Sequence, residues 1–194
     1  MKKSIENVLD VFAKRIYEIQ FAEITDNSKK RAVDTDCRIV SDYLGTMNAE
    51  VSHSTPHILK HCKLWSIEAK SLYANLKDKF NISHSQICEM YVDHITNEYI
   101  VHNSSEKRDF KKFIQRAFCI EHQFPLGIVK EQVINKQFSS ADDVKKYLKK
   151  YINIAIVTSH ENALLNSKSK SAKSLIEAKD RYKKLGIIIE ELIK

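Results

Sequence analysis

The sequence predicts a mainly α-helical protein with a small α+β module in its C-terminal third. Three glycines and two prolines among 194 residues are too few for a β-sandwich or a doubly wound α/β fold, which need many tight turns. Most of the chain repeats apolar residues at helical spacing. Two short apolar runs, 118–123 and 152–157, are instead typical of strands. We therefore expect a helical body over residues 1–116 and an α+β module over residues 117–194.

Five helices are predicted in the first segment. Ser4 and Thr55 are the expected N-caps of the first and third of them, and Gly45 ends the second. Pro56 suits the first turn of the third helix, whose pattern allows a break near Leu64 and Trp65. The predicted ranges are 4–24, 28–44, 56–76, 83–102 and 106–116.

The second segment alternates strands and helices. The pattern predicts strands over 118–123 and 152–157, with helices over 125–136 and 141–151 inserted between them. Thr158 and Glu161 form a capping-box pattern that begins another helix, followed by a polar linker over 166–171. A last, basic helix over 174–184 stops at Gly186, and residues 187–192 fit either a strand or a short helix.

The net charge of +7 lies almost entirely in the C-terminal third. Residues 128–194 hold 14 Lys/Arg against 8 Asp/Glu, whereas residues 1–127 hold 18 against 17. Such a segment suits a polyanion such as nucleic acid, and a lysine-rich solvated surface is the alternative. The four cysteines form no CxxC pair, and no apolar run approaches 18 residues. We expect a cytoplasmic protein with reduced thiols, no signal peptide and no membrane partner.

Two stretches carry the candidate chemistry. Residues 119–125 read Cys-Ile-Glu-His-Gln-Phe-Pro, and residues 155–162 read Ala-Ile-Val-Thr-Ser-His-Glu-Asn. A carboxylate beside a histidine at a strand end can bind a divalent metal and place a general base next to it. A second strand that runs into a helix can bring a further ligand. The alternative is an ordinary strand end, with the histidine packed and the glutamate facing water.

The stretch from Glu121 to Pro125 resembles the acid-His-x-x-Pro signature of the HNH (ββα-metal, His-Me finger) nucleases. Ile156-Val157-Thr158, with Asn162, Asn166 and Lys168 after it, is similar to their second strand and metal-binding helix. Here Glu121 stands where Asp is usual, and about thirty residues separate the strands. The chain also resembles a bacterial group of poorly characterised proteins with Glu-His-x-x-Pro and a late Arg-Tyr-x-x-x-Gly-Ile, which is residues 181–187 here.

The nuclease resemblance implies a role for each matching residue. His122 would be the catalytic base, and Glu121 would hold Mg²⁺ or Mn²⁺. Asn162 or Asn166 would complete the metal site, with His160 as a further candidate. Basic residues of the C-terminal third would contact phosphates. These are Lys168, Lys170, Lys173 and Arg181.

The expected function is therefore a metal-dependent DNA endonuclease of a restriction, defence or mobile-element system, with RNA as the alternative substrate and a homodimer for double-strand cleavage. A non-catalytic helical nucleic-acid-binding or regulatory protein is the first alternative. A protein-interaction module of a defence or toxin–antitoxin system is the second. His57 and His61, spaced i and i+4 beside Cys62, form a weaker zinc pattern.

Overall fold

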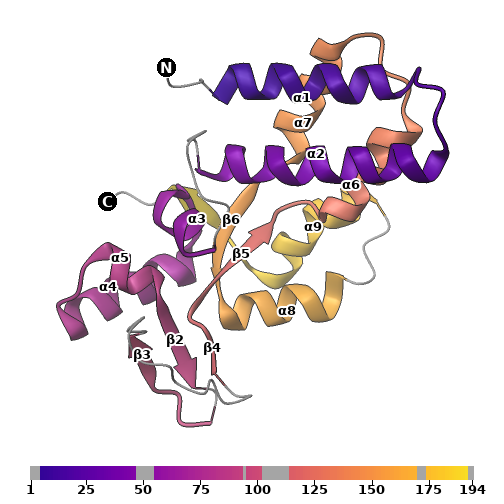
Figure 1. The fold of residues 1–194 in the computed structure, drawn as a ribbon. Coiled ribbons are helices and arrows are strands. Elements are labelled where there is room, and N and C mark those ends of the chain that lie inside the picture. The colour runs from indigo at the N-terminus through magenta and orange to yellow at the C-terminus, as the bar shows by residue number, and fades with distance from the viewer. Residues whose placement is uncertain (1–4, 47–54, 94, 102–113, 170–173, 192–194) are drawn as a thin grey trace.

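The computed structural model describes residues 5–46, 55–93, 95–101, 114–169 and 174–191. Within these ranges the chain is mainly helical, as the sequence predicts, with strands between the helices (Figure 1). None of the described helices combines the length and hydrophobicity that a membrane span requires. The helices are α1 (Ile5–Ile19), α2 (Asp26–Thr46), α3 (Thr55–His61), α4 (Ile67–Phe80), α5 (His84–Cys88), α6 (Leu126–Asn135), α7 (Ala141–Tyr151), α8 (Ser159–Ser169) and α9 (Leu175–Leu185).

The strands form two small sheets. The first has the order β5-β6-β1-β7, in which β6 is antiparallel to β5 and parallel to β1, and β1 is antiparallel to β7. The second has the order β3-β2-β4 and is antiparallel throughout. The strands are β1 (Leu64–Ser66), β2 (Met90–Asp93), β3 (Tyr99–Val101), β4 (Ile114–Arg116), β5 (Phe118–His122), β6 (Ile154–Thr158) and β7 (Ile189–Glu191).

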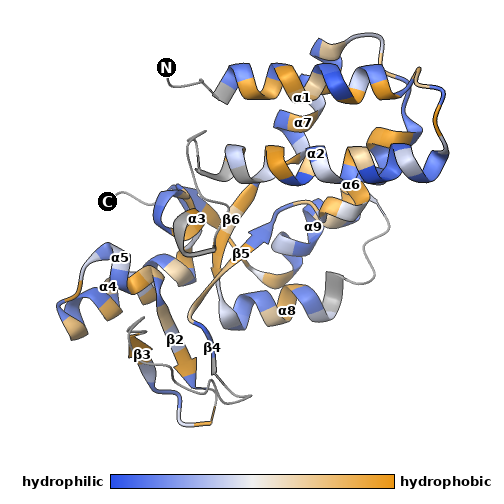
Figure 2. Cartoon of the chain, in the orientation of Figure 1, coloured by the Kyte–Doolittle hydropathy of each residue, from blue (hydrophilic) through white to orange (hydrophobic). Residues whose placement is uncertain are grey.

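Strand β6 lies inside the first sheet and is buried at all five positions. Its sequence, Ile-Ala-Ile-Val-Thr, is almost wholly apolar, as Figure 2 shows. Such a run is expected of a strand that is covered on both faces. On one face it packs with Trp65, which is fully buried and donates its indole N–H to the carbonyl of Cys62 at 3.0 Å. On the other face Val157 packs with Leu165 and Tyr182, from α8 and α9.

A second core lies among α1, α2, α6 and α7. Each contributes apolar residues at helical spacing, among them Leu9, Val40, Val129 and Leu148. Lys145 and Lys149 of α7 also form ion pairs with acidic residues of α1. The α1–α7 contact joins the first predicted segment to the second, and the parallel pairing of β1 with β6 joins them again in one sheet. The predicted boundary near residue 116 therefore runs through a shared core and a shared sheet.

One helix predicted from the sequence is wrong. Residues 83–102 do not form a single helix: α5 ends at Cys88, and β2 and β3 follow as an antiparallel pair. Ser83 and Gln86 do form a capping box, but for this short helix only. After it, burial alternates along Met90–Asp93, and Asn97 adopts a left-handed conformation (φ +56°) in the turn.

The helix predicted over 106–116 is corrected at its end, where residues 114–116 form β4 and pair with β2. Its earlier part lies outside the described residues. The expected break near Trp65 is strand β1. Both strands of the C-terminal segment and the helices over 125–136, 141–151 and 174–184 are confirmed to within a few residues. Helix α8 extends to Ser169, into the predicted linker. Of the strand and the short helix that fit residues 187–192, the structure has a strand, β7.

Candidate functional site

Glu121 lies near the end of β5 and is ion-paired with Arg181 of α9. Arg181 Nη2 donates to Glu121 Oε1 at 2.6 Å and also to the backbone carbonyl of His122. Both side chains are largely buried, with exposed fractions of 7% for Arg181 and 13% for Glu121. Burial raises the pKa of Glu121, and the neighbouring guanidinium opposes this rise. Arg181 therefore links α9 to the end of β5. Because its side chain is buried, it is not placed as a surface contact for phosphate.

His122 faces a different neighbour. Its Nε2 shares a 2.8 Å hydrogen bond with the hydroxyl of Ser41, a buried residue of α2. Burial, and then the charges of Arg38 and Arg181, lower the pKa of His122 to about 4. The imidazole is therefore neutral at pH 7, as a base must be. A pKa this low makes it a weak proton acceptor, because general bases work best with a pKa near the working pH.

The two side chains do not converge on one point. Neighbouring residues of a strand point to opposite faces of the sheet, and here Glu121 meets α9 while His122 meets α2. Within the described ranges, no group of three or more His, Cys, Asp or Glu side chains is placed to hold a metal ion. With its Oε1 taken by Arg181, Glu121 does not fit a Mg²⁺ site, which needs several free oxygen ligands.

The other predicted ligands lie on α8. Asn166 donates its side-chain N–H to Asn162 Oδ1 at 3.1 Å, one turn apart on the helix surface, and His160 is exposed. No described contact joins any of the three to Glu121 or His122. The predicted capping box is confirmed, because Glu161 accepts from the backbone N–H of Thr158 and its own N–H donates to the Thr158 hydroxyl. Lys170, Lys173 and the side chain of Lys168 lie outside the described residues.

The zinc pattern is also not assembled in the described residues. Cys62 is buried, with its Sγ 3.5 Å from the carbonyl oxygen of Leu64, whereas His61 is exposed. The side chain of His57 lies outside the described residues.

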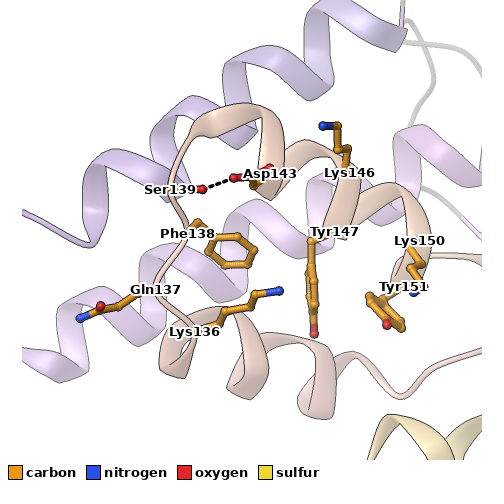
Figure 3. Close-up of a pocket in the computed structure, with 9 residues that line it drawn as sticks. All are labelled: Lys136, Gln137, Phe138, Ser139, Asp143, Lys146, Tyr147, Lys150 and Tyr151. Atoms are coloured by element: carbon orange, nitrogen blue, oxygen red, sulfur yellow. Dashed lines mark hydrogen bonds between the residues drawn. The ribbon is translucent and has the colours of Figure 1, made fainter.

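A different feature gathers cations and rings on one surface. The turn between α6 and α7, with α7 itself, lines a cavity of about 420 Å³ (Figure 3). We call it the lysine–aromatic cavity. The three lysines and three rings that line it are Lys136, Lys146, Lys150, Phe138, Tyr147 and Tyr151.

Cations and rings alternate within this cavity. The ammonium of Lys136 lies 5.2 Å from the ring centroids of both Phe138 and Tyr147, between which Figure 3 shows it. Lys150 lies 5.0 Å from the ring of Tyr151. The Tyr147 and Tyr151 rings are 4.6 Å apart, one helical turn from each other. These distances are typical of cation–π and ring contacts, which hold a partly desolvated cation next to an apolar face.

The lysines on the two sides of α7 differ in their partners. Lys145 and Lys149 are neutralised by Glu6 and Asp10 of α1. Lys146 and Lys150, one residue further on in each case, form no ion pair among the described residues. The cavity lining therefore holds three lysines against one carboxylate, Asp143, which interacts electrostatically with Lys146 and Lys136. A basic cavity with ring faces is suited to phosphates and flat bases.

The sequence analysis missed this site. Its signal is the repeat Lys-Lys-Tyr-Leu-Lys-Lys-Tyr over residues 145–151, which places lysines and tyrosines at i and i+4 on a helix. The number of charges alone could not separate the lysines that pair with α1 from those that form no ion pair among the described residues.

Comparisons of the chain with protein-family models, curated proteins and solved structures give no match. The residues and their geometry are therefore the basis for assigning a function.

Proposed function

We propose that the protein binds nucleic acid through the lysine–aromatic cavity. The observation that carries this proposal is the cavity itself, in which Lys136, Lys146 and Lys150 stand beside Phe138, Tyr147 and Tyr151 without an ion-pair partner among the described residues. Phosphate groups are the natural partners of such ammonium groups, and nucleobases are natural partners of the half-buried rings of Tyr147 and Tyr151, which pack beside the buried Phe138. Three of the 14 Lys/Arg residues of the C-terminal third lie together in this cavity.

The alternatives among binding functions fit this surface less well. A solvated lysine face needs no cavity and no rings beneath its cations. A protein-interaction surface would have an apolar centre with few charges, whereas three lysines lie among the rings here. The charge and the rings together favour a polyanion with flat groups.

The double variant Lys146→Gln/Lys150→Gln is expected to bind nucleic acid more weakly. Each lysine that leaves a phosphate lowers the slope of log K against log salt by about 0.7–0.9, so we expect the slope to fall by about 1.4–1.8. Fluorescence anisotropy with a labelled oligonucleotide, measured between about 50 and 200 mM salt, gives both the affinity and the slope.

The matched control is Lys183→Gln/Lys184→Gln, which removes the same charge from exposed positions on α9. Equal losses in both variants would show that only net charge matters, which would contradict the proposed site. The triple variant Lys168→Gln/Lys170→Gln/Lys173→Gln tests the phosphate contacts that the nuclease resemblance implies. A loss confined to this triple variant would move the interface to α8 and the segment after it.

The endonuclease activity stays a prediction from the resemblance, and the geometry of Glu121 sets its test. Because Arg181 occupies the carboxylate and His122 faces α2, we expect the protein to bind DNA and RNA without Mg²⁺- or Mn²⁺-dependent cutting. Incubation of plasmid DNA and of RNA with each ion, analysed on gels, measures this. Cutting that disappears with EDTA and in His122→Ala would overturn the expectation and establish a metal nuclease centred on His122.

A further inference from the structure

We infer that the lysine–aromatic cavity takes an unpaired strand of nucleic acid, with bases on its rings, and that the strand continues over the turn between α1 and α2. This inference rests on the proposed function and names the form of nucleic acid that the site prefers. It follows from the continuity of two cavities, from the flexible cover of the rings and from unpartnered polar atoms in both cavity walls.

A second cavity, of about 670 Å³, adjoins the first. The two share Lys136, Gln137 and Phe138. The far wall of the second is formed by the end of α1, the turn after it and the start of α2, with Phe21, Lys29 and Lys30. Lys29 donates to the backbone carbonyl of Gln20 at 3.4 Å, neither lysine forms an ion pair among the described residues, and Asp26 is the one carboxylate in this lining. The same combination of ring and cation therefore recurs on both sides of Phe138, as expected of a path for a chain of repeating phosphates and bases.

Lysine ammonium groups lie over the ring faces of the first cavity. Lys150 lies over Tyr151, and Lys136 lies between Phe138 and Tyr147. A lysine has a long flexible stem and a mobile charge, so it can leave the ring for a phosphate while a base takes its place. Bases of a duplex are stacked on each other and cannot offer their faces to these rings. Only unpaired bases can use the ring faces, whereas duplex DNA could use the charges alone.

One residue in the wall of each cavity also has a buried polar atom without a hydrogen-bond partner among the described residues. The hydroxyl of Tyr147 in the first and the side-chain nitrogen of Gln20 in the second are buried, and neither has a hydrogen-bond partner among the described residues. The other side-chain atom of Gln20 is fixed, because its oxygen accepts from the backbone N–H of Phe138 at 3.0 Å. Buried polar atoms in proteins are nearly always hydrogen-bonded. Both atoms are buried beneath the cavity walls, so the edge of an unpaired base can bond to either only when its side chain turns towards the cavity.

The test compares three probes on the full chain by anisotropy and competition. They are labelled single-stranded oligonucleotides of about 16 nucleotides as DNA and as RNA, the duplex of the same sequence, and heparin, a polyanion without bases. We expect single strands to bind at least tenfold more tightly than the duplex. Tyr151→Leu should weaken single-strand binding about tenfold while binding of heparin stays unchanged, because leucine keeps an apolar side chain but removes the flat ring.

Tyr91→Leu, on β2 outside both cavities, is the matched control and should bind as the wild type does. Thermal unfolding of each variant verifies that it is folded. Lys29→Gln/Lys30→Gln should weaken binding of the single-stranded oligonucleotide. Such a loss would show that the bound strand passes over the second cavity. Duplex binding as tight as single-strand binding, or equal losses for all probes in Tyr151→Leu, would overturn the inference while leaving the proposed function in place. Absence of salt-sensitive binding to every probe would overturn the proposed function itself.

Discussion

Replacing Arg181 by methionine is expected to lower the free energy of unfolding by about 3–5 kcal/mol, because the change leaves a buried carboxylate without its cation. Glu121 keeps only 13% of its side-chain surface exposed, and Arg181 keeps 7%. The guanidinium also donates to the carbonyl of His122 at the end of β5. One side chain of α9 thus satisfies both a charge and a backbone acceptor, and methionine can replace neither interaction.

Urea unfolding of the wild type, Arg181→Met and Lys183→Met measures this effect. Lys183 is an exposed residue of the same helix, so its variant controls for the loss of one positive charge. Thermal unfolding of the same variants should show the Arg181 variant melting about 6–20 °C lower, at about 2–4 °C per kcal/mol for a chain of this size. The control should stay within about 0.5 kcal/mol of the wild type.

A double variant separates loss of the pair from loss of packing. Glu121→Gln/Arg181→Met leaves no buried charge, and it should recover part of the stability that Arg181→Met loses. If Arg181→Met unfolds like Lys183→Met, Glu121 is not held by the guanidinium in solution. Its carboxylate would then be free for a metal ion, and the endonuclease prediction would gain a ligand that the present geometry denies it.

The parts of the fold that the sequence predicted well are those with local signals. The helices predicted over 141–151 and 174–184 begin at Ser140 and Ser174, each of which accepts a backbone N–H from the first turn, and Gly186 ends α9 in a left-handed conformation as predicted. These signals lie within a few residues of the structure that they specify. The capping box at Thr158 and Glu161 belongs to the same class.

The wrong prediction of one helix over residues 83–102 comes from contacts that are not local. Met90, Tyr91 and Tyr99 fit a helical spacing, but they also fit two strands that pair with each other and with β4. Strand pairing depends on residues distant in the sequence, so periodicity alone could not decide. The first sheet also depends on residues that are distant in the sequence. Strand β1 is three residues long and is defined by its pairing with β6 and β7, which lie far along the chain.

At the candidate site, the sequence predicted the local structure but not the partners of the side chains. The strand end with Glu121 and His122 is where the sequence placed it, and Arg181 belongs to a segment that the sequence also singled out. Their pairing spans 60 residues, and nothing local encodes it. The opposite directions of Glu121 and His122 follow from strand geometry, but their partners on α9 and α2 could be known only from the fold.

Acidification is expected to destabilise the protein through His122, by up to about 3 kcal/mol between pH 7 and pH 4. Burial lowers the pKa of His122 from its ordinary value of 6.5 to about 4. The unfolded chain therefore binds this proton at a higher pH than the folded chain does. The stabilising contribution is fully present above about pH 6.5 and is lost as the pH falls towards 4. A pKa difference of this size corresponds to about 3 kcal/mol, at 1.36 kcal/mol per unit.

Urea unfolding at about pH 7, 5.5 and 4.5 measures the loss in the wild type, in His122→Gln and in His160→Gln. Glutamine at position 122 can still bond to Ser41 but does not titrate, so His122→Gln should lose less stability with acid than the wild type. His160 is exposed on α8, and its variant should keep the full acid sensitivity. If His122→Gln is as acid-sensitive as the wild type, then His122 titrates in the folded protein much as it does in the unfolded chain. Such a histidine would have the pKa near neutrality that a general base needs, so the measurement separates a structural imidazole from a catalytic one without an assay of cleavage.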